Sequence, residues 1–353
     1  MRKIGLIVGA NIEYAPYVQN YLKIIKRHNI KYKIIEYKKI NLDSDNNNVI
    51  SFQEKKERSN LFQKLIGYYK FINFVKKKIL QEKFSFLVVF TPQICLFMSF
   101  FLEKYYNKKY ILDIRDYNIS FKWSYFLKKI VSNSLLTVIS SGGFKEWLPN
   151  DYEYLIDHNV IIQNERFNIG EANEKNIKIV NCGIIRSLNE NLYLIKELKN
   201  ETEIELEYHG ESSISRILEK YVKENNIKNC KFYGYYKKKD ENIFLLKSTF
   251  INIMQTNDFL SKYALPNRFY KAIILKKPII ATSDNYVGNL VEKYNLGIVI
   301  NKLLITEGLE KELKEFMIKF NIDDFSKNCD KLYKIILEEK NNFEQRISEC
   351  LNM

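Results

Sequence analysis

Apolar residues in this chain form short continuous runs that alternate with stretches of helical periodicity. The runs predict buried strands at residues 4–8, 33–37, 86–90, 110–113, 136–140, 178–182, 203–209, 230–233, 249–254, 278–282 and 297–300. Apolar positions spaced three and four apart predict helices at residues 17–27, 61–83, 212–225 and 324–337, the last with a continuation to residue 350 left open. Strands that alternate with helices are typical of βαβ units on parallel sheets.

The length of the chain favours two domains over one. A single hydrophobic core rarely serves 353 residues, and 46% hydrophobic residues are enough for two cores. A polar stretch at residues 167–175 predicts the boundary. We therefore expect one domain at residues 1–166, a second at 167–337, and a C-terminal helix at 338–353 that could cross back to the first domain.

Positive charge is concentrated in the first half. Residues 1–164 hold 26 Lys and Arg against 14 Asp and Glu, a net charge of +12, whereas residues 165–353 hold 30 against 28, a net charge of +2. Such a field attracts anionic lipid, nucleic acid or a pyrophosphate-linked substrate. Basic residues beside Phe and Tyr at 76–78, 104–109 and 128–129 favour an anionic membrane surface. No nucleic-acid-binding motif accompanies them, so we expect no nucleic acid partner.

Cysteine and histidine give no sign of a disulfide framework or a metal site. The five cysteines are scattered and form no Cys-x-x-Cys pair, which indicates reduced thiols. The three histidines are far apart, and no Asp-x-Asp stands in a suitable position. The longest apolar run, residues 94–102, is interrupted by Ser99 and is too short to span a bilayer. We expect a cytoplasmic protein that associates peripherally with the cytoplasmic face of the inner membrane.

Glycines follow three strands of the second half directly. Gly183, Gly210 and Gly234 stand where each strand ends, a position at which backbone can approach a ligand closely. Arg186 lies three residues after Gly183, and a guanidinium matches phosphate oxygens in bidentate fashion. Downstream, residues 265–272 read Leu-Pro-Asn-Arg-Phe-Tyr-Lys-Ala, and residues 277–281 read Lys-Pro-Ile-Ile-Ala.

These segments resemble the nucleotide-sugar segment of GT-B glycosyltransferases, most of all the family-4 group and its bacterial capsule and lipopolysaccharide relatives. Asp113-Ile114-Arg115-Asp116 resembles a loop that faces the cleft in the same superfamily. Its charges could pair with each other and hold the loop, while one carboxylate receives an acceptor hydroxyl. Residues 138–149, with Ser-Ser-Gly-Gly-Phe and Trp-Leu-Pro, resemble the strand, turn and helix that precede the interdomain linker. The resemblance implies the α/β class and the GT-B fold, with two Rossmann-like doubly wound domains and a cleft between them.

The resemblance also implies site residues. The donor-binding set would be Gly183, Arg186, His209, Gly210, Pro266, Asn267, Arg268 and Lys271, with Arg186 also catalytic through the donor diphosphate. His209 could instead be a satisfied histidine of the core. The acceptor-binding set would be Asn11, Tyr14, Asp113 and Arg115, and the catalytic carboxylates Asp116 and Glu13. Glu13 is the best placed general base if the reaction inverts the anomeric centre. Glu13 could instead only favour the start of the following helix.

The chain departs from the family at three of these positions. Relatives commonly carry a Lys where this chain has Asn191, and a Glu-x7-Glu pair where it has Tyr263 and Lys271. The second Glu of that pair binds the nucleotide ribose in the family. Lys271 could instead replace the missing cation near the diphosphate, or lie on a solvated helix face.

The expected activity is transfer of a hexosyl or N-acetylhexosaminyl group from a nucleotide-diphosphate sugar to a saccharide hydroxyl. The acceptor would be an oligosaccharide or a polyprenyl-pyrophosphate-linked saccharide in surface polysaccharide synthesis. We expect no metal and no cofactor, with the nucleotide-diphosphate sugar as co-substrate. Two alternatives remain open: a nucleotide-sugar epimerase of the same fold, and a non-catalytic partner subunit that lost the Glu pair.

Overall fold

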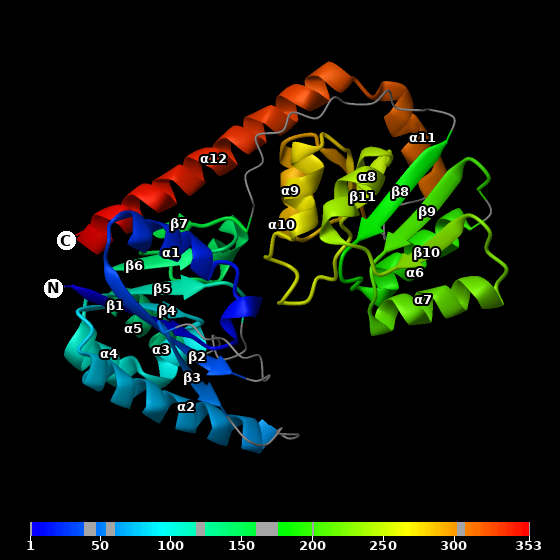
Figure 1. The fold of residues 1–353 in the computed structure, drawn as a ribbon. Coiled ribbons are helices and arrows are strands. Elements are labelled where there is room, and N and C mark those ends of the chain that lie inside the picture. The colour runs from blue at the N-terminus through cyan, green and yellow to red at the C-terminus, as the bar shows by residue number, and fades with distance from the viewer. Residues whose placement is uncertain are drawn as a thin grey trace. The chain divides into compact units, whose positions relative to one another are not determined.

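The chain folds into two units, each built on a parallel sheet (Figure 1). The computed structural model describes residues 2–38, 47–53, 61–117, 124–159, 176–199, 201–301 and 308–352. Unit 1 comprises Met1–Asn159 and Glu338–Met353, and unit 2 comprises Val160–Leu337. The boundary predicted at residues 167–175 lies outside the described residues.

Unit 1 contains a sheet of seven parallel strands in the order β3-β2-β1-β4-β5-β6-β7. The strands are β1 (Lys3–Val8), β2 (Lys31–Lys38), β3 (Val49–Gln53), β4 (Phe86–Phe90), β5 (Tyr110–Ile114), β6 (Leu136–Ile139) and β7 (Tyr154–Ile156). The order reverses at β1, which lies between β2 and β4. The five strands predicted in this half are confirmed, while the edge strands β3 and β7 were not predicted.

Helices complete unit 1. They are η1 (Ile12–Tyr14), α1 (Val18–Arg27), α2 (Leu61–Glu82), α3 (Pro92–Phe97), α4 (Ser99–Tyr106), α5 (Ser124–Asn133) and η3 (Gly142–Glu146). The long apolar run at 94–102 is divided between α3 and α4, with the break at Met98. Within the described segments, no helix is both long enough and apolar enough to cross a bilayer.

Unit 2 contains six parallel strands in the order β10-β9-β8-β11-β12-β13. The strands are β8 (Ile177–Cys182), β9 (Ile204–His209), β10 (Cys230–Gly234), β11 (Phe250–Asn252), β12 (Ile279–Thr282) and β13 (Gly297–Ile300). The helices are α6 (Leu188–Leu198), α7 (Ser213–Glu224), η4 (Lys238–Asp240), α8 (Glu241–Leu246), α9 (Asn267–Ile274), α10 (Tyr286–Lys293) and α11 (Leu309–Lys319).

Side chains from the two faces of the unit 2 sheet enter two separate cores. Val180 and Ile251 belong to the core that includes α9 and α10, whereas Ile179 and Phe250 belong to the core that includes α6 and α11. Alternate residues of each strand therefore point to opposite helical layers. This arrangement confirms the predicted class, with two Rossmann-like doubly wound parallel sheets.

The last helix, α12 (Ile322–Asn352), contributes to both units. Its first half supplies Phe325, Cys329, Leu332 and Ile336 to a core of unit 2. Its second half supplies Phe343, Ile347 and Leu351 to the core of unit 1 that also contains α1. The helix is longer than the predicted minimum of residues 324–337 and passes residue 350.

Candidate active site

The carboxyl ends of β8, β9 and β10 converge on three glycines in unit 2. Gly183, Gly210 and Gly234 have φ angles of +86°, +132° and +66°. The Gly183 N–H donates to the carbonyl oxygen of His209 at 2.9 Å, and the Gly210 N–H donates to that of Gly234 at 2.7 Å. A Cβ atom on Gly210 would stand 1.9 Å from the Gly183 carbonyl oxygen. The strand ends can therefore come this close only because Gly210 has no side chain.

Arg268 in the first turn of α9 lies beside the ends of β8 and β11. Its guanidinium donates to Asn181 Oδ1 and to the carbonyl oxygen of Asn252, the latter at 3.3 Å. Burial, and to a lesser extent the nearby charge of Arg186, lower the pKa of Arg268. Within the described part of the chain no carboxylate forms an ion pair with Arg268. Its positive charge is half-buried and its hydrogen bonds go to neutral oxygens, while the charge of Glu241 acts on it without forming an ion pair among the described residues.

Arg186 brings a second cation to the same region. It lies in the turn between β8 and α6 and its side chain is exposed. Within the described segments, Arg186 makes neither an ion pair nor a side-chain hydrogen bond. The two guanidinium groups are close enough to repel each other, and neither forms an ion pair among the described residues. Together they create a local field that attracts an anion.

Asn191 fixes the turn that carries Arg186. Its side-chain amide donates to the carbonyl oxygens of Arg186 at 2.8 Å and Ser187 at 3.0 Å. Its Oδ1 accepts hydrogen bonds from the amides of Asn181 at 3.0 Å and Asn252 at 3.1 Å. Asn191 is completely buried, so it organises the site without touching a ligand. In the sequence, Asn191 had stood out only because relatives commonly carry a lysine at this position.

His209 supports the end of β9 from within the fold. Its ring is stacked on Phe244 at 3.8 Å and on Tyr233 at 4.5 Å, and its Nε2 lies 3.1 Å from Glu207 Oε2. Only 7% of the residue is exposed. These contacts are those of a satisfied core histidine, the alternative that the sequence left open, and direct contact between His209 and the donor stays a prediction.

The remaining predicted donor residues surround the start of α9. Pro266 precedes the helix, and its carbonyl oxygen accepts the Phe269 N–H at 2.9 Å. Asn267 is exposed, and Lys271 lies one turn further on, where its ammonium donates to Asn242 Oδ1 at 2.9 Å. Lys271 is therefore held by α8 and is on the same helix as Arg268.

The unit 1 candidates include a buried charge cluster at the ends of β5 and β7. The Arg115 guanidinium donates two hydrogen bonds to the Asp113 carboxylate, the longer at 2.6 Å. It donates two more to Asp157, one to the carboxylate at 2.6 Å and one to the carbonyl oxygen at 3.2 Å. Tyr21 donates its hydroxyl to Asp113 at 2.6 Å. Burial alone would lower the pKa of Arg115, but the charges of Asp113 and Asp157 outweigh it and raise the pKa, so the guanidinium stays protonated.

Asp113 and Arg115 are both buried in this cluster. Asp113 has no exposed surface and Arg115 is 6% exposed. Both Asp113 oxygens already accept hydrogen bonds, and direct contact of either residue with an acceptor stays a prediction. Their role is to position the chain that follows β5, where Asp116 is exposed.

The loop after β1 holds the other unit 1 candidates. Glu13 and Tyr14 are exposed in η1, Tyr14 by 63%, whereas Asn11 is 5% exposed. The loop is held by Glu36 of β2, whose Oε2 accepts the Ile12 N–H at 2.8 Å. Glu36 is 2% exposed and was not predicted. The one feature of the sequence that could have indicated the role of Glu36 is that it is an acidic residue inside an apolar strand.

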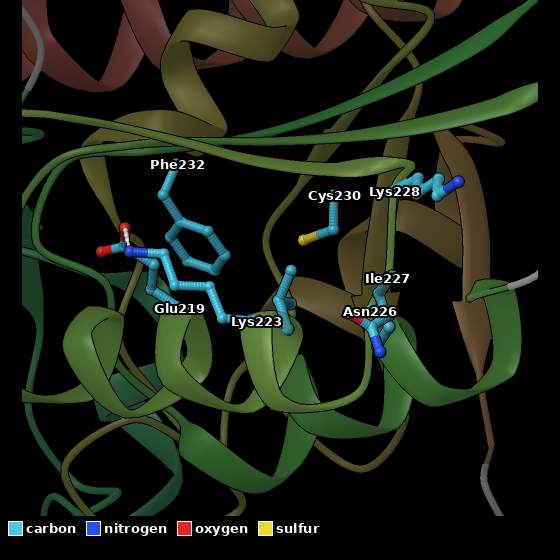
Figure 2. Close-up of a pocket in the computed structure, with 8 residues that line it drawn as sticks. Glu219, Lys223, Asn226, Ile227, Lys228, Cys230 and Phe232 are labelled. Carbon is cyan, nitrogen blue, oxygen red and sulfur yellow. Dashed lines mark hydrogen bonds and ion pairs between the residues drawn. The ribbon is translucent and has the colours of Figure 1, made fainter.

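The site residues of unit 2 do not lie in its described pockets. Figure 2 shows a pocket of about 410 Å³ between α7 and β10, lined by Lys223, Asn226, Lys228, Cys230 and Phe232 among others. A second pocket, of about 750 Å³, is lined by residues that precede β8, β9 and β10 and that begin these strands. Both pockets involve the amino ends of the strands, opposite to the glycines. Among the described residues, no group of three or more His, Cys, Asp or Glu could hold a metal ion.

Comparison with known proteins identifies the fold. No family model matches the sequence, and no curated protein matches it either. Among solved structures, the apo lipopolysaccharide outer core galactosyltransferase WaaB has a TM-score of 0.68 at 13% identity, covering 97% of this chain and 98% of that chain. Sucrose-phosphate synthase from Thermosynechococcus elongatus has a TM-score of 0.69 at 11% identity, covering 99% of this chain and 100% of that chain.

A third match was solved with ligands bound. HepE from Anabaena, in complex with UDP and glucose, has a TM-score of 0.65 at 10% identity, covering 99% of this chain and 100% of that chain. The correspondence extends over nearly the full length of each protein. The chain therefore has the GT-B fold that the sequence segments predicted.

Proposed function

We propose that this protein is a GT-B glycosyltransferase that uses a nucleotide-diphosphate sugar. The observation that carries the proposal is the pair of guanidinium groups, Arg186 and Arg268, at glycine-bounded strand ends in unit 2, where neither forms an ion pair with a described residue. In parallel α/β sheets, ligands bind beyond the carboxyl ends of the strands. The HepE structure with UDP and glucose supports the same class of donor for this fold.

In the proposed reaction, an acceptor hydroxyl oxygen forms a bond to the anomeric carbon of the donor sugar. The bond from that carbon to the diphosphate oxygen breaks, and the electron pair leaves with the diphosphate. Arg186 and Arg268 stabilise the negative charge that develops on the leaving group. Arg186 is exposed and is therefore the guanidinium that can approach the phosphates most freely.

The acceptor would bind unit 1, where two exposed carboxylates are candidates for the proton acceptor. Glu13 follows β1 and Asp116 follows β5. In an inverting reaction one of them takes the proton of the attacking hydroxyl. Asn11 and Tyr14 belong to the same loop as Glu13. The buried pair Asp113–Arg115 would position the chain segment that carries Asp116.

The more detailed assignment, of subfamily, transferred group and acceptor, rests on the sequence segments that resemble the family. We propose a family-4-like enzyme of surface polysaccharide synthesis that transfers a hexosyl or N-acetylhexosaminyl group without a metal. The acceptor would be an oligosaccharide or a polyprenyl-pyrophosphate-linked saccharide. The excess charge of +12 on residues 1–164 supports peripheral association with an anionic inner-leaflet membrane.

A non-catalytic partner subunit is the second candidate. Lys271 stands where relatives keep the second Glu of their pair, and it donates to Asn242. A carboxylate that binds ribose is therefore missing from this place. Turnover of a donor sugar distinguishes the two candidates, because a partner subunit would bind the nucleotide without transferring or hydrolysing the sugar.

The test is nucleotide binding by the wild type and by Arg186→Ala. A thermal-shift screen against UDP, GDP, CMP and dTDP sugars identifies the donor, and calorimetry then measures its affinity. Arg186→Ala should weaken binding by about 1.5–3 kcal/mol, the range of a charge-assisted contact. The control is Lys319→Ala, since Lys319 is exposed at the end of α11 and pairs only with Glu315, at 3.5 Å, among the described residues. Equal affinity of wild type and Arg186→Ala would remove Arg186 from the site.

A further inference from the structure

Unit 2 holds its guanidinium at the strand ends differently from unit 1. In unit 1, Arg115 donates to the carboxylates of Asp113 and Asp157, so two negative charges offset its positive charge. In unit 2, Arg268 donates to Asn181 Oδ1 and to a backbone carbonyl oxygen, and both of these acceptors are neutral. The described groups that hold Arg268 therefore fix the position of the guanidinium without neutralising it.

Three buried asparagines form a continuous hydrogen-bond network beside the two arginines of unit 2. Asn181 of β8 is 3% exposed, Asn252 of β11 is 1% exposed, and Asn191 of α6 is completely buried. Asn191 Oδ1 accepts hydrogen bonds from the other two amides. Its own amide donates to two carbonyl oxygens of the turn that carries Arg186. The network thus connects this turn with the guanidinium of Arg268.

The direction of these hydrogen bonds leaves each amide a single orientation. Backbone carbonyl oxygens only accept, so Asn191 must direct its NH₂ group at the turn and its Oδ1 at Asn181. Asn181 must then donate to Asn191, which leaves its own Oδ1 for Arg268. A guanidinium only donates, so this order supplies the acceptor that it needs. The shape of the turn and the position of Arg268 therefore depend on one chain of hydrogen bonds.

The carboxylate of Glu241 acts on Arg268 without pairing with it in the described part of the chain. Burial lowers the pKa of Arg268, and the charge of Glu241 opposes this effect to a smaller extent. Glu241 is 3% exposed and accepts hydrogen bonds from Tyr236 and Lys238, each at 2.7 Å. Lys238 therefore offsets much of the negative charge of Glu241, and the positive charges of Arg268 and Arg186 stay available to an anion.

We propose that Asn181, Asn191 and Asn252 are positioning residues for the donor diphosphate. Their neutral amides hold Arg268 and the turn of Arg186 in place, so both guanidinium groups keep their full charge for the phosphate oxygens. A carboxylate in place of Asn181 would bind Arg268 more strongly and would compete with the diphosphate for it. The inference rests on the proposed function, and it names the residues that prepare that site for an anion.

The test is calorimetric binding of inorganic pyrophosphate, which requires no particular base, and of UDP and GDP. In Asn181→Asp the new carboxylate pairs with Arg268, so affinity should fall about tenfold or more. Binding should also depend less on salt, because one cation of the site is neutralised. In Asn181→Leu the acceptor is lost without a new charge. Affinity should then fall by a smaller factor, and the salt dependence should stay that of the wild type.

The matched control is Asn229→Leu, which removes another amide of unit 2 that is engaged with the backbone. Asn229 precedes β10, and its amide donates to three carbonyl oxygens, including that of Leu198 at 2.7 Å. Its replacement should lower the midpoint of urea unfolding but leave pyrophosphate affinity unchanged. A loss of affinity in this control equal to that in Asn181→Leu would overturn the proposal.

Glu241→Gln combined with Lys238→Gln keeps the test decisive if the Asn181 variants do not fold. Removal of the carboxylate that acts on Arg268 should tighten pyrophosphate binding about twofold or more, a gain that loss of structure cannot produce. Unchanged or weaker binding in this double variant would contradict the proposal. So would a folded Asn181→Asp protein that binds as tightly as the wild type, or an equal salt dependence in the two Asn181 variants.

Failure of the proposed function gives a different result from failure of this inference. If the wild type binds neither pyrophosphate nor either nucleotide, unit 2 has no donor site and the inference falls with it. If Arg186→Ala and Arg268→Ala weaken binding but Asn181→Asp does not, the donor site stands and only the role of the asparagines is wrong.

Discussion

Glu207 shows how a single buried charge supports the strand end next to the proposed donor site. Burial alone would raise its pKa, but hydrogen bonds from His209 and Lys178 outweigh burial and lower the pKa from 4.5 to about 2. Because the folded-state pKa is depressed, the carboxylate stabilises unit 2 above about pH 4.5, and this contribution is lost as the pH falls toward 2. Glu207→Gln should therefore lower the free energy of unfolding by about 1–3 kcal/mol at neutral pH.

Urea unfolding of the wild type and of Glu207→Gln at several pH values checks this prediction. The difference between the two proteins should shrink as the solution is acidified below the ordinary pKa of glutamate. Glu219→Gln is the control, because Glu219 forms an exposed pair with Lys223 at 2.8 Å and should contribute less than about 1 kcal/mol. A difference that stays constant with pH would mean that the charge of Glu207 is not what stabilises the fold.

At the same scale, the sequence pointed to residues with evident chemistry and missed those that hold them in place. Arg186 and Arg268 were predicted because their segments resemble those of GT-B glycosyltransferases in which a guanidinium contacts the donor diphosphate. Asn191 and Glu36 were not predicted to position the site, since their roles depend on partners that are close only in the fold. The burial of Asp113 beside Tyr21 could likewise not be read from its position in the sequence.

At the scale of elements, the approach of β8 to β9 depends on Gly210. An added Cβ would meet the Gly183 carbonyl oxygen at 1.9 Å, at a φ of +132° that L side chains rarely adopt. Gly210→Ala should therefore destabilise unit 2 by at least about 3 kcal/mol and weaken nucleotide binding. Chemical denaturation and calorimetric titration of the purified variant measure the two effects.

Gly308→Ala separates backbone strain from steric conflict. Gly308 has a φ of +89°, but an added Cβ there would have nothing within 4 Å. Its replacement should cost only about 1–2 kcal/mol and leave nucleotide affinity unchanged. If both alanine variants lose the same stability, close approach of the strands is not the constraint at Gly210.

Strands that are buried on both faces were the easiest elements to predict. Apolar runs such as residues 86–90 coincide with β4, which has no exposed residue. β3 was missed because its side chains are only partly buried and carry little apolar signal. The run at 94–102 was correctly excluded as a membrane span. Its division into α3 and α4, however, depends on packing against α5.

At the scale of the whole molecule, α12 supplies apolar side chains to two separate cores. Phe343 and Ile347 are fully buried in unit 1, whereas Leu332 and Ile336 are buried in unit 2. Composition and length predicted two domains, and the charge difference between the halves predicted that they differ in their partners. Sequence periodicity could not show which core the last turns of the helix would join, because both halves of α12 carry the same apolar spacing.

Substitutions in the two halves of α12 should act on different units. Phe343→Ala should lower the stability of unit 1 by about 3–5 kcal/mol, and Ile336→Ala should lower that of unit 2 by about 2–5 kcal/mol. The two tryptophans, Trp123 and Trp147, belong to the sequence of unit 1, so tryptophan fluorescence reports the unfolding of that unit alone. Phe343→Ala should shift the fluorescence transition strongly and Ile336→Ala only weakly, while circular dichroism records both. Equal shifts of the fluorescence transition in the two variants would contradict this prediction and show that the two units unfold as one. The continuous helix α12 would then transmit the loss of stability in either core to the other.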